Sequence, residues 1–219
     1  MKTRILLADD HQIVRQGLRS LLDQHPDMEV VGEAEDGRKA VEMTDELNPD
    51  VVVMDVGMPG LNGIEATRQV ALKEKGTKVV ALSMHSDRRF VGEMLKAGAK
   101  GYLLKDGAFD ELANAIRTVC ANKVYLSPKI ANFVVEDYVR QRPEVPGKKS
   151  AYASITPRER EVLQLFAEGQ STKQVAATLH LSVKTVETHR RQIMEKLQIF
   201  SVAELTKYAI REGITSAEY

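Results

Sequence analysis

Cysteine is nearly absent from this chain of 219 residues, in which Cys120 stands alone. A lone cysteine cannot form a disulfide within the chain, so nothing points to an oxidising compartment. Cys120 falls in the apolar stripe of a predicted helix, which favours a packed thiol over a reactive one. No apolar run approaches the length that spans a membrane, and no signal peptide precedes the first predicted strand. We therefore expect a soluble, cytoplasmic protein.

Net charge is also lacking, because 31 basic residues balance 31 acidic residues. The charges are unevenly spread, since residues 1–127 carry three more acidic than basic residues and residues 128–219 show the reverse. This asymmetry weakly favours an acidic, metal-binding half and a half that meets a polyanion. Residues 151–219 carry only one more basic than acidic residue, so bulk charge alone does not argue for DNA.

Short apolar runs alternate with helical patterns through the first half of the chain. The predicted strands are residues 4–8, 28–34, 51–55, 78–83 and 101–104, and a helix with one apolar face follows each strand. This alternation predicts an α/β domain at residues 1–122, built on a doubly wound, five-stranded parallel sheet.

A linker is predicted at residues 123–152. Residues 127–140 can form a helix, because apolar residues recur among them. Residues 142–150 combine prolines, a glycine and charges without any periodicity, which is typical of a connecting segment.

Residues 153–219 carry the start signals of four short helices. Thr156-Pro-Arg-Glu159 and Ser171-Thr-Lys-Gln174 are capping boxes, and Ser182 and Ser201 are predicted to cap two further helices. Gly169 and Gly213 are placed to end helices. Two of the helices are joined by a tight turn, which predicts a small all-α helix-turn-helix domain.

Three carboxylates, those of Asp9, Asp10 and Asp55, follow or end neighbouring predicted strands. Ligands collect at the carboxyl ends of strands in open α/β sheets, where an aspartate can bind a metal, act as a base or be a covalent nucleophile. Crowded carboxylates repel one another unless a cation joins them, and hard oxygen ligands suit Mg²⁺. Ser83 and Lys105 end two further strands and could neutralise an incoming phosphoryl group. For any one of these residues taken alone, a solvated loop residue is the better interpretation, and the case for a site depends on all five lying at strand ends.

Periodicity assigns faces to the third helix of the C-terminal domain. Val186, His189, Ile193 and Leu197 recur on one face, which predicts that they meet the core. For His189 this favours packing or a phosphate contact over a catalytic role. The outward residues can contact DNA phosphates or base edges, although an ordinary solvated charged face would look similar. The outward set is Lys184, Thr185, Glu187, Thr188, Arg191 and Gln192, with Arg190 at its flank.

The strand-end residues together resemble the receiver domain of two-component response regulators, which has a flavodoxin-like fold. The resemblance covers about residues 3–122, and its motifs are Ala8-Asp-Asp10, Met54-Asp55, Met58-Pro59, Asn62-Gly63, Ser83 and Gly101-Tyr-Leu-Leu-Lys105.

This resemblance implies a role for each matched residue. Asp55 would accept a phosphoryl group from a partner sensor histidine kinase. Asp10, Asp55 and the backbone carbonyl of Gly57 would hold Mg²⁺, with Asp9 assisting. Lys105 would pair with the phosphate and Ser83 would turn in to hydrogen-bond it, while Tyr102 matches the aromatic residue that rotates with that switch. The only chemistry implied is self-phosphorylation and self-dephosphorylation at Asp55.

The C-terminal domain is similar to the LuxR-type helix-turn-helix. The matching residues are Thr156-Pro-Arg-Glu-Arg-Glu-Val-Leu163, Gly169, Ser171-Thr-Lys-Gln-Val-Ala176, Leu179, Ser182, Thr185-Val186, His189 and Lys196-Leu197. With the receiver, the chain resembles the NarL/FixJ class of transcriptional regulators. Such proteins read the major groove of double-stranded DNA with the third helix and often dimerise through the fourth. The resemblance therefore implies a homodimer when phosphorylated and a promoter with an inverted repeat.

Two other functions remain open from the sequence. A phosphatase of the haloacid dehalogenase type would also use an aspartate nucleophile, but it wants a second aspartate two residues later, where this chain has Gly57. A receiver whose output domain has become a protein-binding module is the other alternative, because the C-terminal domain is weakly basic.

Overall fold

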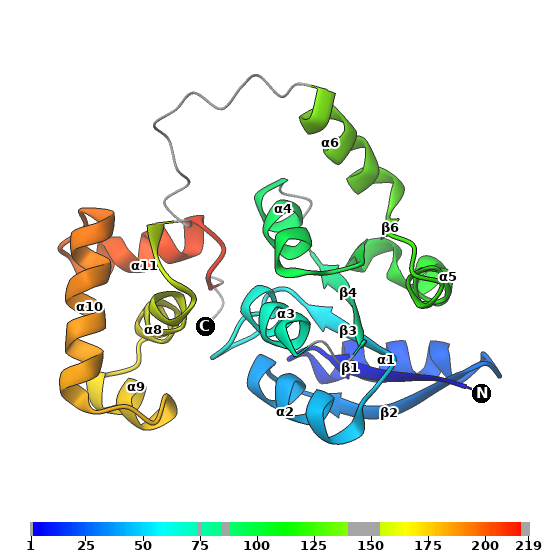
Figure 1. Cartoon of the computed structure of the whole chain (residues 1–219), viewed down its shortest axis with the longest axis horizontal. Coiled ribbons are helices and arrows are strands. Elements are labelled where there is room, and N and C mark those ends of the chain that lie inside the picture. Colours follow the sequence, from blue (N-terminus) through cyan, green and yellow to red (C-terminus); the bar gives the residue numbers. More distant parts are fainter. Residues whose placement is uncertain (1, 74–75, 85–87, 140–153, 216–219) are drawn as a thin grey trace. The chain divides into compact units, whose positions relative to one another are not determined.

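The computed structural model describes residues 2–73, 76–84, 88–139 and 154–215. The chain divides into two compact units, Met1–Arg140 and Gln141–Tyr219, which we describe separately (Figure 1). Among the described residues, no helix combines the length and the apolar character needed to cross a membrane.

The first unit is built on a parallel sheet with strand order β2-β1-β3-β4-β5-β6. Its strands are β1 (Thr3–Ala8), β2 (Met28–Ala34), β3 (Val51–Asp55), β4 (Lys78–Ser83), β5 (Gly101–Leu104) and β6 (Tyr125–Leu126). The predicted fold class is confirmed, but the prediction of five strands was wrong by one. The sixth strand spans two residues, which is too short for an alternating pattern to be recognised in the sequence.

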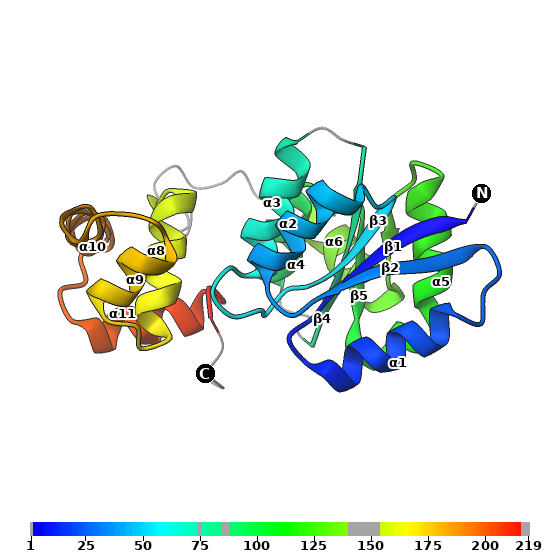
Figure 2. The ribbon, with the colours of Figure 1, turned by 90° about the horizontal axis from the view of Figure 1, so that it is seen from below.

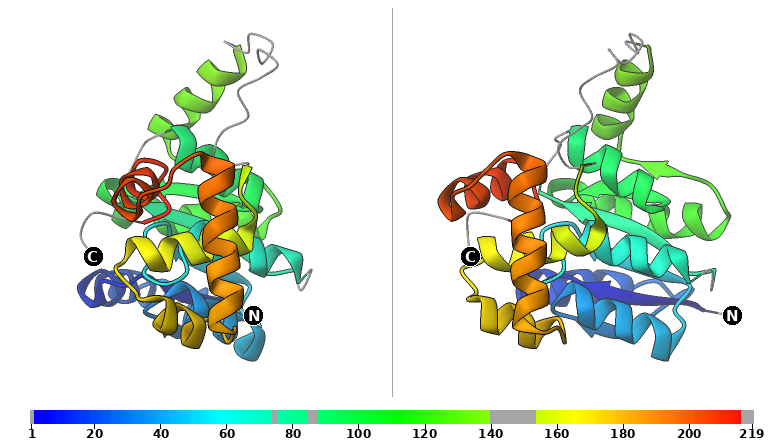
Figure 3. Two further views of the ribbon diagram at one scale, coloured as in Figure 1. Left: turned by 90° about the vertical axis from the view of Figure 1, so that its left-hand side faces the viewer. Right: turned by 60° about the vertical axis from the view of Figure 1, so that its left-hand side comes forward.

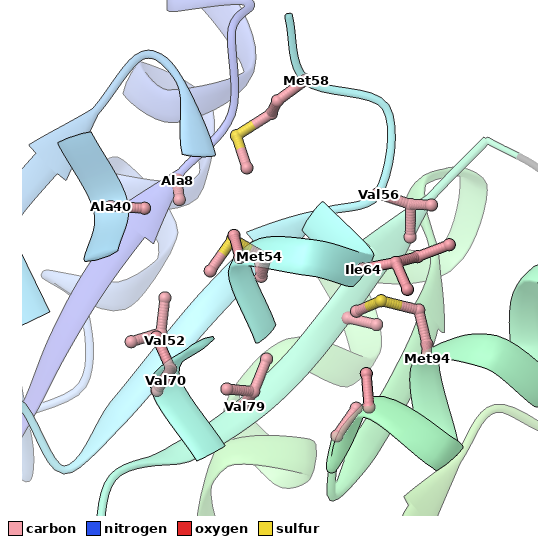
Figure 4. Close-up of a cluster of buried hydrophobic side chains, with 14 of the residues drawn as sticks. Ala8, Ala40, Val52, Met54, Val56, Met58, Ile64, Val70, Val79 and Met94 are labelled. Carbon is pink, nitrogen blue, oxygen red and sulfur yellow. The ribbon is translucent and has the colours of Figure 1, made fainter. Parts of the chain in front are cut away.

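Helices cover both faces of this sheet (Figure 2). They are α1 (Gln12–Leu22), α2 (Gly37–Leu47), α3 (Gly63–Leu72), α4 (Arg88–Ala97), α5 (Ala108–Cys120) and α6 (Pro128–Val139), with a short 3₁₀ helix at Lys105–Gly107. Successive residues of β3 serve opposite faces, since Val52 and Met54 join the core under α2, α3 and α4, whereas Val51 and Val53 join the core under α1 and α5. Figure 4 shows the first of these cores, into which Ile64 of α3 and Met94 of α4 also point. An unbroken apolar strand is required because both faces of β3 are buried.

Cys120 packs at the edge of the core under α1 and α5. Burial raises the pKa of its thiol above the ordinary value, and the negative charge of Asp50 raises this pKa further. A higher pKa leaves less thiolate at neutral pH, so the position fits the packed role expected for this residue.

The helix expected between the two domains is α6, and it packs on the first unit. Ile130 is completely buried in the core with Tyr102 and Met94, and Phe133 and Val134 lie against the same core. β6, which pairs with β5, leads directly into α6. The unstructured segment predicted at residues 142–150 lies outside the described residues.

The second unit is a bundle of helices around its own apolar core. The helices are α8 (Pro157–Ala167), α9 (Thr172–Thr178), α10 (Val183–Leu197) and α11 (Val202–Arg211), and α10 is the long orange helix in Figure 3. Both predicted capping boxes are present, and the Ser182 side chain accepts from the Thr185 N–H. The predicted cap at Ser201 was only partly right. Ser201 occupies the N-cap position of α11, but its side chain makes no capping hydrogen bond.

Candidate functional site

A lysine joins two aspartates at the carboxyl-terminal edge of the sheet. Asp9 directly follows β1, Asp55 ends β3 and Lys105 directly follows β5. The Lys105 ammonium lies 2.7 Å from Asp9 Oδ2 and 2.9 Å from Asp55 Oδ2. Asp9 and Asp55 are 1% and 4% exposed, so these charges interact with little screening by solvent. The expected meeting of these strand-end residues is therefore present in the fold.

The crowding of charges shifts the ionisation of this site. Burial raises the pKa of Asp55 above its ordinary value, and the neighbouring charge of Asp9 raises it further, which outweighs the contributions of Lys105 and of the Gly57 N–H. Burial acts to lower the pKa of Lys105, but the carboxylates of Asp55 and Asp9 outweigh it, so the pKa of this lysine is raised. Lys105 is therefore a firmly charged partner beside an aspartate that is costly to ionise.

The donor set at this edge fits a divalent cation. One ligand atom from each of Asp9, Asp10, His11 and Asp55 lies within 4.8 Å of the others. Three of the four donors are carboxylate oxygens, the ligands that Mg²⁺ prefers. A dication would relieve the repulsion that one lysine only partly offsets.

Arg15 and Glu33 support the loop after β1. Arg15 Nη1 donates to the backbone carbonyl of Asp9 at 2.6 Å, and its Nε lies 3.4 Å from Glu33 Oε2 on β2. Sequence reasoning missed both residues, and it also missed His11. His11 could have been found, because it directly follows the Asp9-Asp10 pair. The pairing of Arg15 with Glu33 could not have been predicted, because it joins residues of different elements and produces no recognisable pattern in the sequence.

Ser83 and Tyr102 are both buried beside this edge. Asp55 pairs with Leu82 in the β3–β4 register, so Ser83 lies one residue beyond that pair. In the β4–β5 register, Ser83 pairs with Leu104. Tyr102 is completely buried in the core that includes Ile130. Its carbonyl accepts from the Ser127 N–H at 3.0 Å, which ties β5 to the start of α6.

Of the glycines that follow Asp55, Gly57 in the loop is open, whereas Gly63 at the start of α3 packs tightly. A side-chain carbon at Gly57 would meet nothing within 4 Å, whereas one at Gly63 would clash with the backbone of Asp55. The Gly57 N–H donates to Asp55 Oδ1 at 3.3 Å. The buried Asp55 is thus supported by α3, while the chain at exposed Gly57, two residues later, is unobstructed.

The faces of α10 largely follow the prediction. Val186 and Ile193 are buried, and Leu197 packs against the same core. His189 is half-buried with its Nδ1 enclosed, in accord with the predicted inward face. Among the outward residues, Lys184, Glu187, Arg191 and Gln192 are exposed, whereas Thr185, Thr188 and Arg190 are half-buried.

The half-buried residues of this face make contacts within the second unit. The Arg190 guanidinium lies over the Phe166 ring, 5.5 Å from its centroid. Thr188 donates to the Lys184 carbonyl one turn earlier. Arg190 therefore packs on α8, and in this respect it differs from Arg191, which is exposed to solvent. A depression of about 310 Å³ adjoins both arginines, lined by Glu187, Arg190, Arg191, Met194, Glu195 and Phe200.

An ion pair between exposed Lys196 and buried Glu159 fastens α10 to α8. Lys196 Nζ lies 2.8 and 2.7 Å from the two carboxylate oxygens of Glu159, and Glu159 also accepts from the Thr156 N–H. Burial acts to raise the pKa of Glu159, but the hydrogen bonds from Lys196 and Thr156 outweigh it and hold the pKa below its usual range. Glu159 thus completes the capping box of α8, whose N-cap residue is Thr156, and also holds α10 through Lys196.

Comparisons with known proteins match both units. Residues 5–117 match the response regulator receiver domain, and residues 153–209 match the bacterial regulatory proteins of the luxR family. The chain is 39% identical to the oxygen regulatory protein NreC of Staphylococcus epidermidis, covering 96% of this chain and 98% of that protein. It is 38% identical to the transcriptional regulatory protein LiaR of Bacillus subtilis, covering 97% and 99%. A solved complex of the two-component response regulator RcsB with DNA is similar over 95% of this chain and 98% of that chain, with a TM-score of 0.59 and 26% identity.

Proposed function

Since this chain belongs to the DNA-binding response regulators of the NarL/FixJ class, which join a receiver domain to a LuxR-type DNA-binding domain, we propose that Asp55 is its phosphoacceptor. The observation that carries the proposal is the contact of the Lys105 ammonium with both Asp9 and Asp55 at the end of β3. The donor would be the phosphohistidine of a cognate sensor histidine kinase.

The transfer needs a nucleophile and groups that hold the phosphoryl oxygens. An Asp55 carboxylate oxygen attacks phosphorus, the P–N bond to the donor imidazole breaks, and the bonding electrons leave with that nitrogen. Lys105 neutralises charge on the phosphoryl oxygens, and the Ser83 hydroxyl donates to one of them. Hydrolysis of the acyl phosphate at Asp55 ends the signal, so the only chemistry of the chain is its own phosphorylation and dephosphorylation.

Mg²⁺ is the cofactor that this donor set would hold. Asp10, Asp55 and the backbone carbonyl of Gly57 would be its ligands, with Asp9 assisting. When bound, the ion supplies charge neutralisation to the reacting phosphoryl group. The crowded, buried carboxylates of Asp9 and Asp55 support this assignment, because their repulsion is reduced by a dication.

Phosphorylation would act on the output through the buried switch residues. Ser83 moves toward the phosphoryl group and Tyr102 adjusts behind it in the core. The backbone of Tyr102 holds β6 and the start of α6, and Ile130 of α6 packs in the same core. A change at Tyr102 would therefore alter how firmly α6 is held, and through α6 it would control dimerisation and promoter binding.

The C-terminal domain would read double-stranded DNA with α10. The residues that we assign to the contact are Lys184, Thr185, Glu187, Thr188, Arg190 and Arg191. The exposed Lys184 and Arg191 suit phosphate or guanine contacts, while Arg190 supports the helix against Phe166. A homodimer formed on phosphorylation would bind an inverted repeat, since the symmetry of the site mirrors that of the protein.

The test incubates the full chain with acetyl phosphate and Mg²⁺ and measures the intact mass. We expect one added phosphoryl group on the wild type and none on Asp55→Asn, which keeps the shape and removes the nucleophile. Equal labelling of the variant would refute the assignment. Selection of bound sequences from random DNA duplexes, with and without acetyl phosphate, then tests the output.

A further inference from the structure

His11 places an imidazole among the carboxylates of the phosphoacceptor site. Its Nδ1 lies 2.8 Å from Asp10 Oδ1 and 3.4 Å from Asp9 Oδ1. Its backbone N–H donates to Asp9 Oδ1 at 2.9 Å, and His11 is the N-cap residue of α1. The hydrogen bond to Asp9 therefore fixes the backbone of His11 next to the carboxylates of the site. The side chain is 53% exposed, so the ring stands at the mouth of the site and open to solvent.

The spacing of the four donor atoms suits a single six-coordinate ion. Ligands about 2.1 Å from an octahedral ion lie about 3.0 Å apart when adjacent and about 4.2 Å apart when opposite. The separations of 2.8 and 3.4 Å from His11 Nδ1 to the two carboxylate oxygens match adjacent ligands. The limit of 4.8 Å that contains Asp9, Asp10, His11 and Asp55 leaves room for opposite ones.

An imidazole changes which ions a carboxylate site prefers. Mg²⁺ takes oxygen ligands and keeps several waters, whereas imidazole suits first-row transition ions, whose affinity for nitrogen-containing sites rises from Mn²⁺ through Co²⁺ to Ni²⁺. We propose that His11 is an additional metal ligand, which enables the Asp9–Asp10–Asp55 site to take a first-row transition-metal dication in place of Mg²⁺. This inference rests on the proposed function for the location of the metal, and it adds the nitrogen donor and the class of ion.

A positioning role for His11 makes a different prediction. If the imidazole only hydrogen-bonds Asp10, its removal weakens every ion alike, because the same carboxylate is left less well oriented. If Nδ1 binds the ion, its removal weakens transition ions and spares Mg²⁺. The comparison between ions therefore separates the two roles.

The test uses the full chain and two matched variants, His11→Asn and His180→Asn. His11 makes no side-chain capping bond, and asparagine is a favourable N-cap residue, so His11→Asn does not weaken the start of α1. Asparagine also tolerates the left-handed backbone of exposed His180. We expect calorimetric titration to show about a tenfold or greater loss of Ni²⁺ and Co²⁺ affinity in His11→Asn, with Mg²⁺ affinity within about twofold of wild type. His180→Asn should match wild type for all three ions.

Pulsed electron paramagnetic resonance of bound Mn²⁺ provides a direct readout. We expect nitrogen modulation from a directly bound imidazole in wild type and in His180→Asn, and its loss in His11→Asn. Absence of that modulation in wild type, or an equal loss of affinity for Mg²⁺ and Ni²⁺ in His11→Asn, would overturn the proposal. Asp55→Asn separates a failure of this inference from a failure of the proposed function. If this variant binds Mn²⁺ as tightly as wild type, the ion lies elsewhere and the proposed phosphoacceptor site itself is wrong.

Discussion

Gly63, the first residue of α3, lies directly against the backbone of Asp55. A side-chain carbon at Gly63 would come within 1.9 Å of the Asp55 carbonyl oxygen, and the Gly63 N–H donates to the Val56 carbonyl at 3.0 Å. This contact means that the start of α3 determines where β3 ends and where its carboxylate points.

Gly63→Ala should therefore damage the receiver twice. Relief of the clash must move β3 or α3, which should cost about 1–3 kcal/mol of unfolding free energy. A displacement of Asp55 should also slow phosphorylation by acetyl phosphate, by up to about 100-fold for a shift near 1 Å. Urea unfolding and the rate of mass labelling measure the two effects. Gly92→Ala is the control, because a carbon there meets nothing within 4 Å and alanine favours the helix. Wild-type behaviour of Gly63→Ala would contradict the contact.

Asp55→Asn should stabilise the metal-free protein at neutral pH. The pKa of Asp55 is raised in the folded state, so the stability associated with its protonated form is present below the ordinary aspartate pKa and is lost as pH rises through the folded pKa. Asparagine does not ionise, so the variant does not lose this stability. We expect its unfolding free energy to exceed that of wild type by about 0.5–2 kcal/mol at pH 7, and the difference to vanish in acid. Thermal unfolding at several pH values measures it, with the exposed Asp106→Asn as control. A variant less stable than wild type at pH 7 would show that the bond from Lys105 outweighs the burial of Asp55.

Lys105→Met should uncouple phosphorylation from DNA binding. Methionine keeps much of the side-chain volume but removes the cation that joins Asp9 to Asp55. Mg²⁺ affinity should not fall, because the ion loses a competing cation, whereas the phosphorylated variant should lack the rise in DNA affinity. We expect that rise to be about 5–150-fold in the wild type. Binding of labelled duplex before and after acetyl phosphate measures it, with Lys39→Met on α2 as control. A normal rise in the Lys105 variant would remove this lysine from the switch.

Arg191→Ala and Arg190→Ala should fail in different ways. Arg191 is exposed, so its loss should leave stability unchanged and weaken specific DNA binding by about 1–3 kcal/mol if it contacts a base. If it contacts phosphate, the salt slope of binding should shrink by about one for all sequences. Arg190 lies over Phe166, so its loss should lower the unfolding temperature as well. Lys207→Ala removes an exposed charge of α11 as a control. If Arg191→Ala binds like the control, our assignment of the reading face is wrong.

Glu159→Gln should destabilise the C-terminal unit in a pH-dependent manner. The pKa of Glu159 is lowered in the folded state, so its contribution is complete above the ordinary glutamate pKa of about 4.3 and is lost as pH falls through the folded pKa. The variant should therefore be less stable than wild type at pH 7, and the difference should narrow in acid. Hydrogen exchange of the α8 and α10 amides measures this, with Glu204→Gln as the exposed control. A difference that does not change with pH would mean that the Lys196 pair contributes through packing.

The sequence by itself determined the local structure of this protein. Buried strands such as Val51–Asp55 were recognisable as apolar runs, and the helix starts at Thr156, Ser171 and Ser182 followed from side chains that bond backbone groups three residues away. Because parallel strands bring their carboxyl ends to one edge, the sequence also indicated that Asp9, Asp55 and Lys105 would meet there.

Tertiary structure alone decided the contacts that give these residues their properties. Lys105 and Asp55 are 50 residues apart, and their separation of 2.9 Å depends on the packing of three strands rather than on any local pattern. The same holds for the stacking of Arg190 on Phe166 and the pairing of β6 with β5. Ser201 has the sequence of a cap and makes no capping bond, since local preference only proposes a hydrogen bond. The physical reason is that capping hydrogen bonds and apolar periodicity involve residues close together in the sequence, so they can be recognised from it. The distances between segments far apart in the sequence are fixed only when helices pack on both faces of the sheet.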